Sequence, residues 1–154
     1  FRVQWVGDPD LKESKHFYVT AAQLPVALSP DQNAIQVLHR FKILVSVGAA
    51  SATAQLQVAE TRIEADANGK PRPVLTVRND GTTYGYVSQR RMTIIQRGAG
   101  GEEIFRKSFE PDEIGQRMGM GLVPSGQSRV LPINVELPQA TGTLTIELTS
   151  AGSN

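Results

Sequence analysis

The sequence contains no cysteine and only two histidines, His16 and His39. Structural disulfides and thiolate metal sites are therefore excluded, because both require cysteine sulfur. No run of apolar residues in the sequence approaches the roughly 20 that a membrane-spanning helix needs. Positive and negative charges nearly cancel, which leaves a formal net charge of +1. This balance gives no electrostatic reason to expect binding to nucleic acid or to an anionic membrane.

Residue patterns for catalysis are also scarce. A Ser-His-acid triad could be drawn from His16 or His39, but both lie in alternating segments and no nucleophile motif accompanies them. The glycine-rich segment 98–101 lacks the spacing and the lysine of a phosphate-binding loop, so it predicts a hairpin turn. The acidic pairs at 102–103 and 112–113 have no partner at a metal-binding or acid-base spacing. We expect no enzymatic activity, no metal and no cofactor.

The most informative segment covers residues 35–47. Its alternate positions carry Ile35, Val37, His39, Phe41, Ile43, Val45 and Val47. This period of two predicts a half-buried strand, and at about 3.3 Å per residue it would reach roughly 43 Å, twice the usual length. An ordinary β-sandwich cannot bury all of it, so we expect one end to present an exposed edge that a partner pairs with. The alternative is that Ile35 and Val37 are core residues of a complete sandwich.

The remaining chain alternates short apolar segments with turn signals, such as those at 66–69 and 79–81. We expect a loop at 23–33, an irregular segment at 109–120, and a linker at 49–52, where the residues are small. The pattern predicts strands over residues 1–6, 16–20, 56–65, 73–78, 84–88, 92–97, 103–108, 129–137 and 143–149. Many short strands with regular turns and no convincing amphipathic helix indicate an all-β fold of the sandwich type.

Several stretches carry a family resemblance in their order along the chain. An aromatic strand at 16–19 precedes the pair Leu24-Pro25, and the alternating residues 35–37 precede the basic segment 40–43. An Asn-containing turn at 79–81 and a Pro-x-Gly turn at 124–126 follow. In this order the chain resembles the periplasmic pilus chaperones, the PapD-like family. It departs from the family at 45–48, where an aromatic-Arg-Pro ending is usual.

The resemblance implies two immunoglobulin-like β-sandwich domains. Residues 1–48 would be the carboxy-terminal part of the first domain, represented only by its last strands, 49–52 the linker, and 53–154 the second domain. The implied function is that of a periplasmic chaperone. It binds and stabilises pilus or fimbrial subunits by donor-strand complementation before their delivery to an outer-membrane usher.

The resemblance also implies which residues bind the subunit. The donated residues would be Ile35, Val37 and His39. Lys42 matches the family's basic anchor for the subunit's terminal carboxylate, and Arg40 and Arg2 are substitute anchors; the alternative is that Lys42 and Arg40 are solvated strand charges. The exposed edge also predicts self-association. Two other functions stay open, a structural or adhesive module such as a pilus subunit or cell-surface domain, and an accessory domain of an enzyme.

Overall fold

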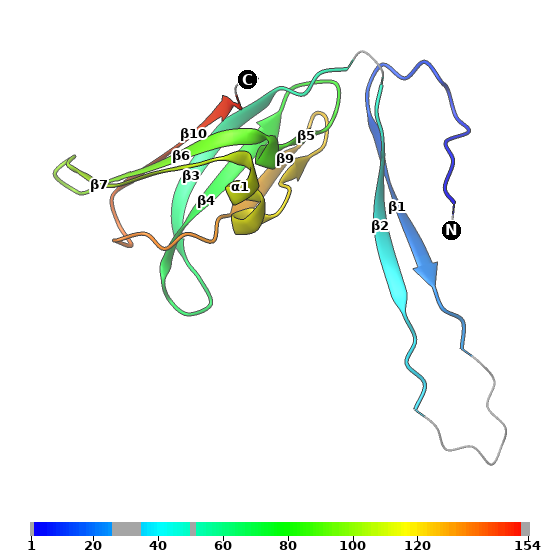
Figure 1. Ribbon diagram of the computed structural model, residues 1–154, viewed down its shortest axis with the longest axis horizontal. Helices are drawn as coiled ribbons and strands as arrows, with labels where there is room; N and C mark the ends of the chain where they lie inside the picture. The colour runs from blue at the N-terminus through cyan, green and yellow to red at the C-terminus, as the bar shows by residue number, and fades with distance from the viewer. Residues whose placement is uncertain (1, 26–34, 50–51, 152–154) are drawn as a thin grey trace.

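The computed structural model describes residues 2–25, 35–49 and 52–151. Strands are the predominant regular structure, so the expected all-β fold is confirmed. The strands are β1 (Lys15–Ala22), β2 (Arg40–Val47), β3 (Leu56–Ala65), β4 (Pro71–Asn79), β5 (Gly85–Tyr86), β6 (Arg90–Arg97), β7 (Glu103–Phe109), β8 (Leu122–Val123), β9 (Ser128–Pro132) and β10 (Thr143–Ser150). One α-helix, α1 (Pro111–Met118), and one 3₁₀ turn, Val87–Gln89, complete the elements. β1 and β2 stand apart from the others as a projecting hairpin (Figure 1).

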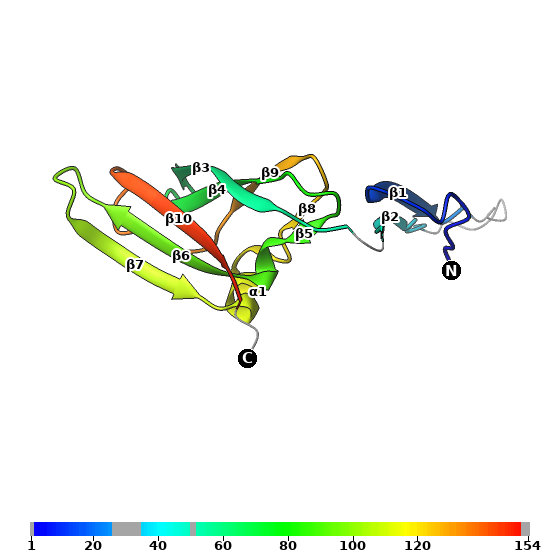
Figure 2. The same cartoon turned by 90° about the horizontal axis from the view of Figure 1, so that it is seen from above.

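The other strands form two three-stranded antiparallel sheets and one short pair. One sheet has the order β10-β6-β7, the other has the order β3-β4-β9, and β5 pairs with β8. Figure 2 shows the two larger sheets as separate layers. We call this part, residues 52–151, the two-sheet body.

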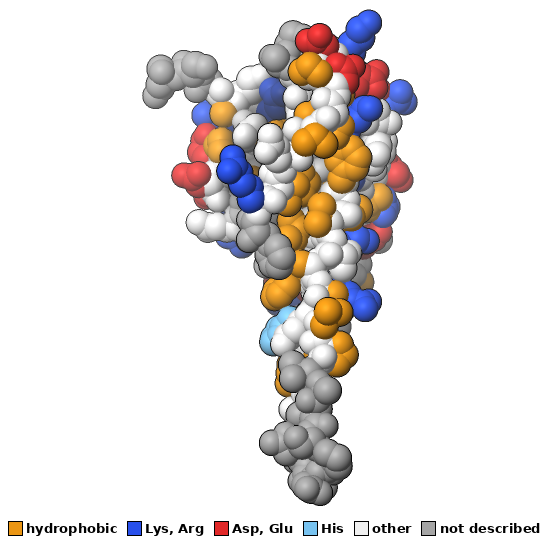
Figure 3. All heavy atoms as spheres, turned by 90° about the vertical axis from the view of Figure 1, so that its right-hand side faces the viewer, with side chains coloured by type: hydrophobic (Ala, Val, Ile, Leu, Met, Phe, Trp, Pro, Cys, Tyr) orange, Lys and Arg blue, Asp and Glu red, His pale blue; other side chains and the backbone are white. Residues whose placement is uncertain are grey.

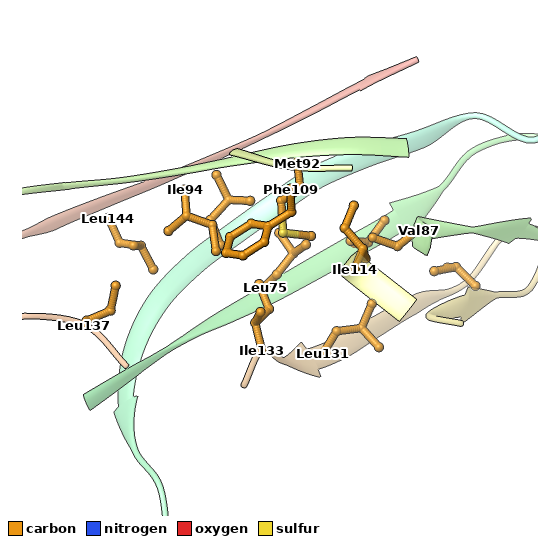
Figure 4. Packing of buried hydrophobic residues seen from close by; sticks show 13 residues of the cluster. Leu75, Val87, Met92, Ile94, Phe109, Ile114, Leu131, Ile133, Leu137 and Leu144 are labelled. Carbon is orange, nitrogen blue, oxygen red and sulfur yellow. The ribbon is translucent and has the colours of Figure 1, made fainter. Parts of the chain in front are cut away.

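The core of the two-sheet body lies between its two larger sheets. Buried residues come from both layers, including Leu75 of β4 and Leu131 of β9 on one side and Ile94 of β6 and Ile146 of β10 on the other. The side chains labelled in Figure 4 meet between the sheets. Alternate strand residues point to one face, so the side chains that enter the core are two residues apart, as Leu75 and Val77 are in β4.

Strand β3 contains a β-bulge that shifts the alternation by one residue. Val58 lies opposite Val77 of β4, whereas Glu60 lies opposite the next residue, Thr76, so Ala59 has no partner across the ladder. One extra residue moves every later side chain of the strand to the other face. Inward positions therefore change from even numbers before the bulge to odd numbers, such as Ile63, after it.

A buried asparagine ties the end of β4 to its neighbours. Asn79 has no exposed surface. Its side-chain oxygen accepts hydrogen bonds from the backbone N–H groups of Gln55 and Gly81, both at 3.0 Å. Its side-chain nitrogen donates to the carbonyls of Thr83, at 2.7 Å, and Val123, at 3.0 Å. The side chain thus fills its hydrogen-bonding capacity inside the protein, which is the condition for burying a polar group cheaply. The turn signal at 79–81 did not reveal this role.

The segment expected to be irregular, 109–120, contains α1, so that prediction was wrong. Glu110 and Glu113 form a capping box at the start of the helix, where Pro111 occupies its first turn. The helix buries Ile114, which is 1% exposed. Among the described residues no helix has the length and apolarity to cross a membrane.

Three strand predictions also differ from the structure. Residues 2–6 belong to no strand. Instead, the indole N–H of Trp5 donates to the carbonyl of Asp8 at 3.0 Å. Strand β9 ends at Pro132, well before 137, and the next residues make only isolated backbone bonds to β4. Proline has no N–H to continue the ladder, which explains the early end. The expected strand 84–88 is divided between β5 and the 3₁₀ turn.

Candidate functional site

The β1–β2 hairpin packs against few other described elements, and many of its apolar side chains are exposed. Its antiparallel register runs from Lys15 opposite Val47 to Ala22 opposite Arg40. Facing residues of a ladder lie on the same side of the sheet. The odd-numbered residues therefore form one face, which we call the outer face, and the even-numbered residues form the inner face. The expected strand at 16–20 and the start of the expected loop at 23 agree with this hairpin, and loop positions 26–33 lie outside the described residues.

The outer face is apolar and mostly uncovered. It carries Phe17, Val19, Phe41, Ile43 and Val45. Phe41 is 60% exposed and Ile43 is 47% exposed, values far from those of a core. Trp5 covers part of Phe17, with 5.7 Å between the ring centroids. Figure 3 shows hydrophobic side chains running along the hairpin. An exposed apolar surface of this kind marks a place where another element packs.

The outer edge of β2 has no further strand among the described residues, because the sheet contains only β1 and β2. The predicted strand over 35–47 is shorter than expected, since β2 begins at Arg40 and residues 35–39 belong to no strand. The backbone N–H of Gln23 donates to the carbonyl of His39 at 2.9 Å, and no other described strand lies beside the preceding residues. A strand needs a ladder partner, and β1 has already ended at Ala22.

The three predicted donor residues lie together in this segment. Ile35 is 96% exposed and Val37 is 68% exposed. His39 is also exposed, and its ring nitrogen Nδ1 lies 3.1 Å from the side-chain oxygen of Gln23. The His39 ring stacks on Phe41 with 6.1 Å between centroids. Ile35 therefore has nearly its full surface available to a partner, and Val37 about two thirds of its surface.

The predicted anchor residues are divided between two segments. Lys42 and Arg40 lie on the inner face of β2, and the Lys42 ammonium sits 4.2 Å above the ring of Tyr18. Arg2 lies apart from them in sequence, in the exposed segment before β1 that belongs to no strand. None of the three has a carboxylate within 4 Å in the part of the chain that the structure describes. Both basic side chains of β2 are thus available to an external carboxylate.

A cleft of about 320 Å³ separates the inner face of the hairpin from the two-sheet body. The hairpin lines it with His16, Tyr18 and Leu44, and the body lines it with Leu122, Pro124, Gln127 and Arg129. Tyr18 belongs to both the cleft and the Lys42 contact, so the ammonium of Lys42 lies beside the cleft.

A few contacts hold the hairpin against the body. The backbone N–H of Ser14 donates to the carbonyl of Thr82 at 2.8 Å. The ring of His16 meets the ring of Tyr84 edge-on, 5.8 Å between centroids. The two ring nitrogens of His16 lie 3.2 Å from the Ser14 hydroxyl and 2.9 Å from the Ser46 hydroxyl. Burial lowers the pKa of His16 below its ordinary value, because the charged form loses hydration.

Reasoning from the sequence placed no residue of this cleft in the functional site, and Tyr18 and Arg129 are two examples. Tyr18 could have been identified from its spacing, because alternation places it on the face opposite Phe17 and Val19. Arg129 carried no such signal, since its position depends on how β9 meets the hairpin. Its guanidinium donates from Nη1 to the carbonyl of Leu122 at 2.7 Å.

Within the described residues, no three metal-ligating side chains come together. We found no family model, no curated protein and no solved structure that matches this chain. The site is therefore interpreted from its own geometry: an exposed strand edge, an uncovered apolar face and an adjoining cleft beside the Lys42 ammonium.

Proposed function

We propose that this chain is a periplasmic chaperone that binds pilus or fimbrial subunits by lending them a strand. One observation carries the proposal: among the described residues β2 has no further strand on its outer edge, and just before it Ile35 is 96% exposed and Val37 is 68% exposed. A protein avoids such an edge unless a partner pairs with it. In strand donation, main-chain hydrogen bonds supply affinity, and alternate side chains fill pockets in the partner.

The energetics fit this kind of partner. Burying an exposed aliphatic side chain contributes roughly 1.5–3 kcal/mol. Ile35 and Val37 lie two residues apart, so in an extended backbone both would point to the same side, into a groove of the subunit. His39 would follow on that side. It marks the point at which the segment joins the hairpin, because its carbonyl already accepts a bond from Gln23.

The basic residues of β2 would set the register of the complex. We propose that Lys42 binds the subunit's terminal carboxylate, with Arg40 one step along the same face. In the free chain the Lys42 ammonium rests on the Tyr18 ring. A carboxylate would therefore replace a cation–π contact with an ion pair, which fixes register more than it adds affinity. Arg2 is the weaker substitute, since it lies outside the hairpin.

The domain arrangement belongs to the same proposal. The uncovered outer face of the hairpin supports the view that residues 1–48 are part of an immunoglobulin-like sandwich whose second layer would cover Phe41 and Ile43. Residues 49–52 would be the linker and 53–154 the second immunoglobulin-like domain. Delivery of the bound subunit to an outer-membrane usher follows from the family resemblance.

The test is co-purification of the chain with the pilus subunit encoded nearest to it. We expect Val37→Asp to reduce the complex by about tenfold or more, because a carboxylate would enter an apolar groove. Lys42→Ala should weaken the complex or allow the subunit to bind in shifted registers, which cross-linking and mass spectrometry would detect.

Val130→Asp is the matched control. Val130 is an exposed valine of β9, in the two-sheet body, so the same change there should leave the complex intact. Circular dichroism would check that each variant is folded. If Val37→Asp and Lys42→Ala both bind like the wild type, strand donation is wrong and the chain is better explained as a structural or adhesive sandwich module.

A further inference from the structure

The two-sheet body contains a second hollow, of about 450 Å³, that takes no part in the proposed strand donation. It lies where the turn after β3, the start of β4, the end of α1 and the segment after β9 meet. Its charged lining consists of Asp66, Lys70, Arg72, Arg117 and Glu136. The volume is within the roughly 300–1,000 Å³ of small-molecule sites.

Backbone hydrogen bonds hold the walls of this hollow in place. The N–H of Asn134 donates to the carbonyl of Arg117 at 3.0 Å, which ties α1 to the segment after β9. The N–H of Leu137 donates to the carbonyl of Pro71 at 2.9 Å, which ties the same segment to β4. The hollow is thus formed before any ligand arrives, which lowers the cost of binding.

Both carboxylates of the hollow already have partners. One oxygen of Asp66 accepts hydrogen bonds from the backbone N–H groups of Asn68, at 2.8 Å, and Lys70, at 2.9 Å. These bonds lower the pKa of Asp66, with smaller contributions from the charges of Arg72 and Lys70. Glu136 forms an ion pair with the Lys70 ammonium at 2.7 Å. Neither carboxylate forms an ion pair within 4 Å of Arg72 or Arg117.

The two arginines of the hollow make no contact ion pair with a carboxylate of the described chain. Arg117 donates from Nη1 to the carbonyl of Asn134 through a long bond of 3.4 Å. The Nε of Arg72 is buried and makes no hydrogen bond. Glu64 lies opposite Arg72 in the ladder, but its carboxylate bonds to Arg62 at 2.7 Å. No carboxylate of the described chain lies within 4 Å of either Arg72 or Arg117.

A buried guanidinium N–H without an acceptor is costly and rare in native proteins, so it requires an explanation. We propose that this hollow is an oxyanion site, in which Arg72 and Arg117 bind a carboxylate or phosphate group. A guanidinium presents its N–H groups as a planar fork that matches these oxyanions. Because Nε is buried in the free chain, the proposal requires the Arg72 side chain to rotate so that Nε and one Nη meet the same ligand. Binding of the oxyanion satisfies the group that the free protein leaves without a partner.

The test is an NMR titration of the full chain, ¹⁵N-labelled, that follows the arginine Nε–H signals. One arm uses inorganic phosphate and the other uses a blocked triglutamate peptide, both at constant ionic strength. We expect a saturable shift of the Arg72 Nε–H signal. Arg72→Gln and Arg117→Gln should each weaken the apparent affinity by about tenfold or more, because each removes a charged hydrogen bond. For Arg72→Gln, backbone amide signals around the hollow report binding.

Arg90→Gln is the matched control, because Arg90 bonds to the Ser150 hydroxyl and does not line the hollow. It should bind like the wild type. Saturation at lower concentration by the peptide would identify an acidic segment of a protein as the source, and by phosphate a free small oxyanion. The proposal fails if neither probe gives a saturable shift, or if Arg117→Gln, at an exposed position, stays folded and binds unchanged. It stands or falls independently of strand donation.

Discussion

The β1–β2 hairpin and the two-sheet body share one sequence pattern but bury it to very different extents. In the body, alternate apolar residues such as Leu75 and Ile94 have no exposed surface. In the hairpin, the equivalent residues Phe41 and Ile43 are about half exposed. The difference is the second layer, which the body has and the described hairpin lacks. Alternation therefore determines which side chains share a face, and a separate element determines whether that face becomes a core.

The edge strands of the body and of the hairpin also differ, in whether they carry charged side chains. β7 forms an edge of its sheet and carries charged residues, with Glu103 bonded to Arg106 at 2.7 Å. Charges on an edge strand discourage pairing with other chains. The edge of β2 leads instead into Ile35 and Val37, both exposed and apolar. The β7 edge is thus protected against strand addition, whereas we propose that the β2 edge takes part in it.

The largest expected change in the free energy of unfolding is for one of two phenylalanines that we compare. Phe109 in the body is 2% exposed, whereas Phe41 in the hairpin is largely exposed. Phe109→Ala should lower the free energy of unfolding by about 3–5 kcal/mol, since it removes buried contacts and leaves a cavity. Phe41→Ala should change it by less than about 0.5 kcal/mol, as exposed substitutions do. Denaturant unfolding followed by circular dichroism measures both. Equal losses would mean that the outer face of the hairpin is covered in solution.

A smaller effect is expected for the asparagine at the end of β4. Asn79→Ala leaves two backbone N–H groups and two carbonyls without their partner, and should cost about 2–3 kcal/mol of unfolding free energy. Asn68→Ala, at an exposed turn, is the matched control and should cost a few tenths. The same unfolding measurement applies. A loss below about 1 kcal/mol for Asn79→Ala would show that water replaces these hydrogen bonds.

The smallest expected effect on stability comes from His16, at the contact between the hairpin and the two-sheet body. Burial lowers the pKa of His16, so near pH 6 the unfolded chain binds more protons at this site than the folded chain. Its contribution to stability is therefore complete above the ordinary pKa of 6.5 and is lost as the pH falls below that value. An NMR titration should show the His16 ring signal titrating below pH 6.5. Tyr84→Ala should move the midpoint upward, because it exposes the ring. A midpoint unchanged by Tyr84→Ala would mean that the hairpin and body separate in solution.

Much of the strand pattern could be predicted from the sequence, because turn residues and alternation are local. The turn at 66–69 and the strands on either side of it lie where the sequence placed them. The helix α1 was missed although it carries local signals, with Pro111 at its start and acidic residues in its first turn. Gly115 in the middle of the helix weakened these signals, since glycine disfavours a helix.

The candidate site was only partly predictable. Exposure of Ile35 and Val37 followed from the length of the alternating run, and the structure finds both exposed. The extent of the strand did not follow, because a strand ends where its ladder partner ends, and β1 stops at Ala22. Contacts between the hairpin and the body could not be predicted from the sequence either, because they join segments that are far apart along the chain. Arg129 reaches the cleft only through the arrangement of two distant segments.

The bulge at Ala59 also determines where the chain can lose a residue. Deleting Ala59 would join Val58 to Glu60 in one regular ladder and keep both halves of β3 facing as they do now. Deleting Thr61 would retain the bulge and turn Ile63 from the core toward solvent. Single-residue deletions in β3 should therefore be tolerated at one position and rejected a few residues later. In homologues, length variation within this strand is expected at position 59.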